Sequence, residues 1–221
     1  MKIKTGLLLA CCLVTASVLS DELTLRVQLA GGAGPVTGAV VYLNDGSQAS
    51  PLRAEMFQKD RMFHPQILIL PVGSSVDFPN RDNTQHHVYS FSPAKTFNLE
   101  LYAGMPETPV LFDQPGIVEL GCNIHDHMQA FIVVADTRAI GKTNEQGEVT
   151  LALNFGASQP PGSLSLNIWH PRLPDNTRPV IQEIDAASLA NSTAEIVSIE
   201  LKPEPRNEGP LDHLQKRFRE L

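Results

Sequence analysis

Short alternations of apolar and polar residues, broken every few positions by proline or glycine, run through almost the whole chain. Alternation with a period of two, rich in β-branched residues, is typical of half-buried strands. The 17 prolines and 15 glycines leave little room for long helices. The clearest such segments are residues 22–29, 38–43, 66–78, 86–91, 96–102, 117–122, 130–136, 139–153, 162–171, 178–184 and 194–201. The pattern predicts an all-β fold built of sandwiches.

The predicted strands fall into two sets. Residues 53–136 form one block. The phrases "GPVTGAVVYL", "GKTNEQGEVTLAL" and "GSLSLNIWHP" lie in residues 22–50 and 137–202 and are similar to a small transthyretin-like or carboxypeptidase-regulatory-like sandwich. The first block would then be inserted between two strands of that second sandwich, because insertion at an exposed loop is tolerated. A tandem arrangement, with residues 22–136 as one domain, is the alternative.

The two ends of the chain have a different character. Lys2 and Lys4 precede the apolar stretch "GLLLACCLVTASVL", which is typical of a secretory signal peptide over residues 1–20. No later run is long and apolar enough to span a bilayer, so we expect an exported, periplasmic protein without stable membrane insertion. Residues 203–221 form a charged tail, in which "GPLDHLQKRFREL" has the spacing of a helix.

Cysteine and charge narrow the possible functions. Two of the three cysteines would leave with the signal peptide, so Cys122 alone remains. A single thiol in an oxidising compartment indicates intermolecular pairing, a reactive group or a metal ligand. The formal net charge of −7 argues against nucleic acid as a partner and favours a basic one.

The segment "GCNIHDHMQAFIVV" gathers the remaining thiol with imidazoles and a thioether, in the spacing Cys122-x2-His125-x2-Met128. This donor set suits a soft, redox-active metal, and a His2Cys site with a weak axial Met is the blue-copper arrangement. Zinc also takes Cys and His, but Met is a poor zinc ligand. Cys122 could instead be a nucleophile activated by His125 or His87. A second imidazole must come from upstream, where the candidates are His64, His86 and His87.

Residues 53–136 resemble the cupredoxins, especially the plastocyanin and amicyanin group. The resemblance lies in "HPQILILPVGSSVDFPNRD", "HHVYSF", "FDQPGIVELGC" and "CNIHDHMQAFIVV". It implies a Greek-key β-sandwich that holds one copper ion. Asn80 stands six residues before the expected first ligand, which selects His86 over His87. The implied ligands are His86, Cys122, His125 and Met128.

The mature chain also resembles the cupredoxin-like proteins labelled methylamine utilisation proteins in bacteria. These resemblances imply a periplasmic type 1 (blue) copper protein that carries single electrons and is not an enzyme. Its redox partner would be an amine-oxidising dehydrogenase or a cytochrome c. Two alternatives remain open, a copper carrier or buffer without electron transfer, and a β-sandwich interaction module without metal. His87 and His127 depart from the family pattern, and we expect a supporting role for His87 and an exposed loop position for His127.

Overall fold

The computed structural model describes residues 22–45, 47–154, 162–186 and 194–204. The expected signal peptide (1–20) and the expected helix of the C-terminal tail lie outside these residues. Apart from a single turn of 3-10 helix, η1 (Ala30–Gly32), the described residues form strands, turns and loops with no α-helix. The prediction of an all-β sandwich fold is confirmed.

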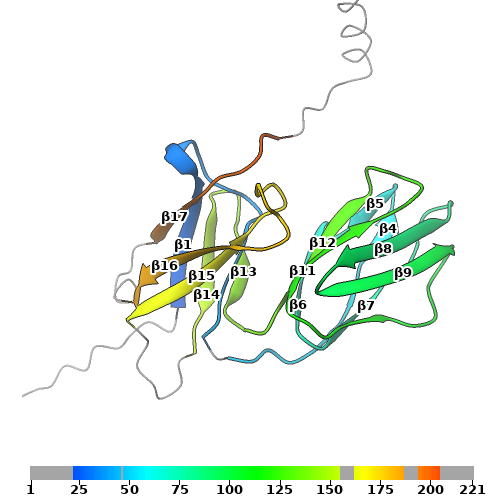
Figure 1. Ribbon diagram of the computed structural model, residues 1–221, viewed down its shortest axis with the longest axis horizontal. Helices are drawn as coiled ribbons and strands as arrows, with labels where there is room; N and C mark the ends of the chain where they lie inside the picture. Colours follow the sequence, from blue (N-terminus) through cyan, green and yellow to red (C-terminus); the bar gives the residue numbers. More distant parts are fainter. Residues whose placement is uncertain (1–21, 46, 155–161, 187–193, 205–221) are drawn as a thin grey trace, which may run out of the picture.

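Half of the molecule, on the right in Figure 1, is built from strands between Arg53 and Ala135. A five-stranded sheet has the order β6-β12-β11-β8-β9, and a three-stranded sheet has the order β10-β7-β3. The five strands are β6 (Ile67–Pro71), β12 (Gln129–Ala135), β11 (Gly116–Gly121), β8 (His86–Ser92) and β9 (Lys95–Tyr102). The three are β10 (Val110–Phe112), β7 (Ser74–Asp77) and β3 (Arg53–Glu55), and a hairpin of β4 (Phe57–Lys59) and β5 (Met62–His64) completes this half.

The other half, on the left in Figure 1, combines strands from both ends of the described chain. One sheet has the order β14-β1-β17 and the other β13-β2-β15-β16. Their strands are β1 (Glu22–Leu29), β14 (Glu148–Ala152), β17 (Glu195–Ile199), β13 (Ile140–Lys142), β2 (Val40–Leu43), β15 (Ser163–Trp169) and β16 (Val180–Asp185). Among the described strands, β1 and β2 pair with β13 to β17, and β3 to β12 pair among themselves.

Strand β12 joins the two halves. Its residues from Ala130 to Ala135 are all buried, which is unusual for an antiparallel sheet with one face in water. Ile132 and Val134 face the core of the β3–β12 half, whereas Phe131 and Val133 belong to the core of the other half. The strand is therefore covered on both faces, and the sandwiches share an apolar contact.

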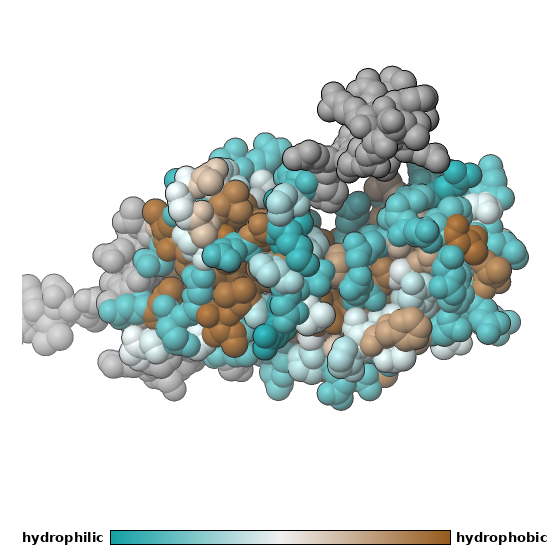
Figure 2. Space-filling view, turned by 45° about the horizontal axis from the view of Figure 1, so that its top comes forward, coloured by the Kyte–Doolittle hydropathy of each residue, from teal (hydrophilic) through white to brown (hydrophobic). Residues whose placement is uncertain are grey.

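Exposed apolar side chains occur on both halves. On the face seen in Figure 2 a hydrophobic area lies over the left-hand half, which contains β14 to β17, and in this half Ile181 of β16 and Ile196 of β17 are 64% and 58% exposed. Both strands lie at sheet edges. Among the described residues, no helix has the length and hydrophobicity needed to cross a membrane.

Candidate metal centre

The loop between β11 and β12 carries the thiol, one imidazole and the thioether. Gly121 and Gln129 pair with each other at the ends of the two strands and so fix the base of the loop. Within the loop, the backbone N–H of Met128 donates to the His125 carbonyl oxygen at 2.9 Å. Cys122 and Met128 are 4% and 2% exposed, so both sulfur side chains lie in the buried core of this half.

Gly121 lies directly before Cys122, and the Tyr89 side chain leaves little room for a larger residue there. It pairs with Tyr89 of β8, and a Cβ atom at this position would lie 2.8 Å from the Tyr89 ring. A larger residue would push the ring, or β11 itself, away from the start of the loop. The Tyr89 ring therefore packs closely against the end of β11, directly before Cys122.

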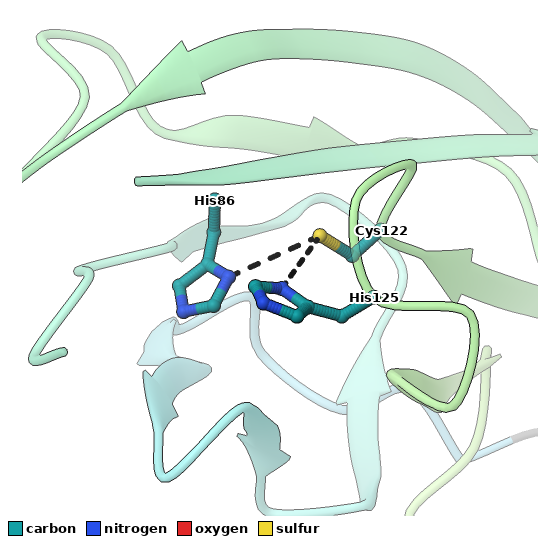
Figure 3. A group of neighbouring side chains, drawn as sticks. All are labelled: His86, Cys122 and His125. Carbon is teal, nitrogen blue, oxygen red and sulfur yellow. Dashed lines mark hydrogen bonds between the residues drawn. The ribbon is translucent and has the colours of Figure 1, made fainter. Parts of the chain in front are cut away.

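The second imidazole comes from the first residue of β8. His86 is fully buried, and its Nδ1 atom lies 3.9 Å from Cys122 Sγ. His125 Nδ1 lies 3.9 Å from the same sulfur, and its ring is next to that of His86 (Figure 3). One ligand atom from each of the three residues falls within 4.8 Å of the others, so the sequence-predicted set of one thiol and two imidazoles meets at one point.

The loop before β8 is held by side-chain hydrogen bonds. Asn80 Nδ2 donates to the carbonyl oxygens of Thr84 and Tyr102, at 2.8 and 3.0 Å, and Asn80 Oδ1 accepts from the backbone N–H of Asp82 at 2.9 Å. These bonds tie the loop to the end of β9. Asn80 therefore places His86 by shaping the segment that leads to it.

Asp82 was missed by reasoning from the sequence. Its Oδ2 atom lies 2.8 Å from His86 Nε2, on the side of the ring away from the sulfur. The only signal in the sequence was that Asp82 stands four residues before His86. In a loop, that spacing does not predict that the two side chains touch. In the structure, the Asp82 carboxylate therefore borders the cluster of His86, Cys122 and His125.

Electrostatics favour a neutral imidazole at His125. Desolvation lowers its pKa below the ordinary value, and the nearby His86, Arg61 and His127 lower it further. A neutral imidazole has a lone pair for a metal, whereas a protonated ring has none. This ligand candidate is thus ready to bind at neutral pH.

The other candidate histidines do not join the cluster. His64 is half-buried, stacks on Phe57 with ring centroids 5.1 Å apart, and has Nε2 3.2 Å from the Lys59 carbonyl oxygen. His87 points to Tyr89, with ring centroids 5.5 Å apart, and its buried Nδ1 has no hydrogen-bond partner among the described residues. His127 is exposed, as expected, with its ring 6.2 Å from that of His125.

The geometry fits a metal ion. Bonds of about 2.3 Å to sulfur and about 2.0 Å to nitrogen, as zinc makes, together exceed the 3.9 Å between Cys122 Sγ and either Nδ1, so an ion can bind the sulfur together with either imidazole. Two imidazoles, one thiol and a buried thioether in the same core form the donor set that copper prefers. The residues present therefore fit a copper ion.

No family model matches the chain, and no curated protein matches it significantly in sequence. One similar solved structure is a Cu-containing nitrite reductase from Thermus scotoductus SA-01, which is 23% identical in sequence and has a TM-score of 0.36. The match covers 40% of this chain and 23% of the reductase. The match thus spans less than a quarter of that enzyme.

Two smaller proteins are matched over nearly their whole length. A purple cupredoxin from Nitrosopumilus maritimus has 20% identity, coverage of 37% of this chain and 99% of its own, and a TM-score of 0.33. Amicyanin from Paracoccus versutus has 12% identity, coverage of 43% and 97%, and a TM-score of 0.33. The similar structures are cupredoxins and a copper enzyme, at low identity and over less than half of this chain.

Proposed function

We propose that this chain is a periplasmic type 1 copper protein that carries single electrons between redox partners. His86, Cys122, His125 and Met128 would hold one copper ion. The observation that carries the proposal is that Cys122 Sγ lies 3.9 Å from the Nδ1 atom of each of two imidazoles, at the end of a β-sandwich. Four protein ligands leave no open position for a substrate, which favours a carrier over an enzyme.

The chain's own residues would keep the site rigid. A bound copper ion would supply the one-electron change between Cu(I) and Cu(II). Cys122 and Met128 provide soft sulfur, which suits Cu(I), and the two imidazoles provide nitrogen, which suits Cu(II). Because His86 begins one strand and the other three residues lie between two paired strands, the donor atoms can stay in place when the charge changes.

A docking face beside His125 supports a carrier role. Ile124, Leu101 and Phe91 are 46%, 52% and 81% exposed, and they line a hollow of about 650 Å³ next to the loop. His125 itself is half-buried, so its ring connects the buried sulfur to the surface. With a net charge of −7, the chain suits a redox partner with basic residues around an apolar patch, such as an amine-oxidising dehydrogenase or a cytochrome c.

The same proposal assigns the copper site to one of the two sandwiches. Residues 53–136 would form the copper-carrying cupredoxin unit, inserted into a second sandwich made of residues 22–50 and 137–202. The pairing of β1 with β14 and β17, across the intervening strands, supports this nested arrangement over a tandem one. The methylamine-utilisation group named by the sequence resemblance remains the proposed family.

The absorption spectrum of the copper-loaded protein tests the proposal. The thiolate–copper bond should give the Cu(II) form an intense colour that a reductant removes and an oxidant restores. Cys122→Ser should bind copper weakly and stay colourless. His127→Ala, which removes an exposed imidazole from the same loop, should keep the full spectrum.

Other outcomes would favour other functions. A colourless Cu(II) form of the native chain, or a coloured Cys122→Ser variant, would rule out the proposed site. Copper that exchanges quickly with a chelator and is lost during redox cycling would point to a copper carrier or buffer. If equilibrium dialysis shows no tight copper binding, the remaining hypothesis is a β-sandwich interaction module without metal.

A further inference from the structure

A carboxylate lies behind the buried imidazole of the candidate site. Asp82 sits in the loop between β7 and β8, and its Oδ2 atom is 2.8 Å from His86 Nε2. His86 has no exposed side-chain surface and the Asp82 side chain is only 10% exposed, so the pair is nearly shielded from water. An ionic hydrogen bond in such a place is stronger than one at the surface.

Asp82 is itself fixed by the backbone of a different element. The turn between β4 and β5 has Asp60 and Arg61 in the left-handed region, with φ of 54° and 57°. This conformation directs both backbone N–H groups at the carboxylate, where Asp60 N donates to Oδ1 at 2.7 Å and Arg61 N to Oδ2 at 3.0 Å. The two-residue loop between the paired residues Lys59 and Met62 requires positive φ at both positions, and the bonds to Asp82 stabilise this turn.

Both oxygens of the Asp82 carboxylate accept backbone N–H donors, Oδ1 from Asp60 at 2.7 Å and Oδ2 from Arg61 at 3.0 Å. A carboxylate whose two oxygens already accept hydrogen bonds is also the acceptor towards the imidazole, so the proton between the two groups belongs to His86 Nε2. The Nδ1 atom, 3.9 Å from Cys122 Sγ, is then left with its lone pair.

The second imidazole has no such partner. Within the described part of the chain, no carboxylate is hydrogen-bonded to His125, whose ring is half-buried. The site is therefore asymmetric, with one imidazole locked by a charge in the interior and the other bordering the surface. The two rings have different tasks.

We propose that Asp82 is a positioning residue of the metal site, which holds His86 in its Nε2–H form and strengthens Nδ1 as a ligand for Cu(II) over Cu(I). The inference rests on the proposed copper function. A histidine that donates its other N–H to a carboxylate is a better electron donor, and the negative charge stabilises the more highly charged ion. Asp82 thereby sets the reduction potential of the site below the value that the four ligands alone would give.

Spectroscopy of the metal-free wild-type protein tests the positioning step without copper. Nitrogen-15 NMR of the imidazoles should show His86 with its proton on Nε2, in slow exchange with water. A proton on Nδ1 would overturn the inference. Because this measurement needs no metal, it remains decisive if the protein turns out not to be a blue copper protein.

The variant Asp82→Asn tests the effect on the metal. It removes the charge, and we expect Cu(II) affinity to fall by about 10- to 100-fold with a smaller loss for Cu(I). The reduction potential should rise by about 59 mV for each tenfold change in the ratio of the two affinities. Asp60→Asn is the matched control, since it removes a charge from the neighbouring β4–β5 turn, and Asp60 contacts Asp82 only through its backbone.

The outcomes separate the two proposals. If Asp82→Asn and Asp60→Asn both keep the wild-type potential, the role of Asp82 is wrong and the copper function stands. If the wild-type protein gives no coloured copper form, the copper function fails, and the NMR result alone decides whether Asp82 holds His86. If Asp82→Asn does not fold, Asp82→Ala in copper-loaded protein and the wild-type NMR spectrum replace it, with the same expected directions.

Discussion

At the scale of single residues, burial decides what each histidine can do. His86 and His125 meet Cys122 from different elements, and the chemistry of the cluster depends on both rings being neutral. His170, in the other half of the molecule, is a buried histidine with a structural role. The backbone N–H of Arg172 donates to its Nδ1 atom at 3.1 Å, which only a neutral ring can accept.

His170 predicts a pH dependence of stability. Burial first, and then the Arg172 charge, lower the pKa of His170 despite its bond to the Thr37 backbone. The unfolded chain therefore binds a proton near pH 6.5 that the folded chain resists, so the free energy of unfolding should fall as the pH drops below about 6.5. Unfolding of the metal-free protein by urea at pH 7.5 and 5 measures this loss.

The variant His170→Asn provides the control. Its amide oxygen can still accept the Arg172 N–H, but it has no proton to bind, so the difference between the two pH values should shrink. A smaller dependence should remain, because the pKa of His125 is lowered as well. A wild-type protein that becomes more stable as the pH falls from 7.5 to 5 would contradict the assignment.

Part of the site could be predicted from single residues. The spacing from Cys122 to Met128 indicated the loop, because the residues are neighbours in the chain. The choice of His86 over His87 depended on Asn80, known only from a family resemblance. Asp82 could not be foreseen, because its place depends on the turn at Asp60 and Arg61, whose left-handed conformation the sequence does not reveal.

At the scale of elements, the loop of the site depends on the two strands that bear it. Strand β12 is the more important, since it pairs with β11 and β6 and contacts both cores. Phe131 packs against Trp169 of β15, with ring centroids 5.0 Å apart. The contact links the sheet of the candidate site to the other half of the molecule.

The variant Phe131→Ala tests that link. Removing a buried phenylalanine side chain should lower the free energy of unfolding by about 3–5 kcal/mol. Urea unfolding followed by the fluorescence of Trp169, the single tryptophan, gives the value. Phe91→Ala is the control, since Phe91 is 81% exposed and its loss should change stability by less than about 0.5 kcal/mol. Equal stabilities of the two variants would show that β12 does not couple the halves.

Strands with clear alternation were predicted well. The segment "QILILPVGSSVDF", residues 66–78, was predicted to be strand, and it forms β6 and β7, which end and begin at Pro71 and Ser74. The β4–β5 hairpin was not foreseen, since its strands are three residues each and its turn has no glycine. Such short elements are set by contacts with the rest of the fold, here with Asp82.

At the scale of the whole molecule, the pairing of distant strands was the hardest feature to predict. The sequence left open whether the two sandwiches are nested or in tandem, because strand patterns do not name their partners. The structure pairs β1 with β17 in parallel, from Leu25 with Glu195 to Leu29 with Ile199. Such a contact depends on the entire chain between these strands, so no local signal could reveal it.

The arrangement has a consequence for the proposed function. A second hollow, of about 700 Å³, reaches Cys122 and Met128 and is lined on one side by Thr177, which belongs to the other half. The end of the sandwich that carries the candidate metal site therefore borders the other sandwich as well as solvent. A partner that docks there would contact both halves at once.

X-ray absorption at the copper edge is the most direct test of the central claim, that Cys122, His86 and His125 bind one copper ion. The Cu(II)-loaded protein should show one short copper–sulfur bond and two imidazole nitrogens. The sulfur contribution should disappear in Cys122→Ser and persist in His127→Ala. A copper ion surrounded only by nitrogen and oxygen in the native chain would contradict the account.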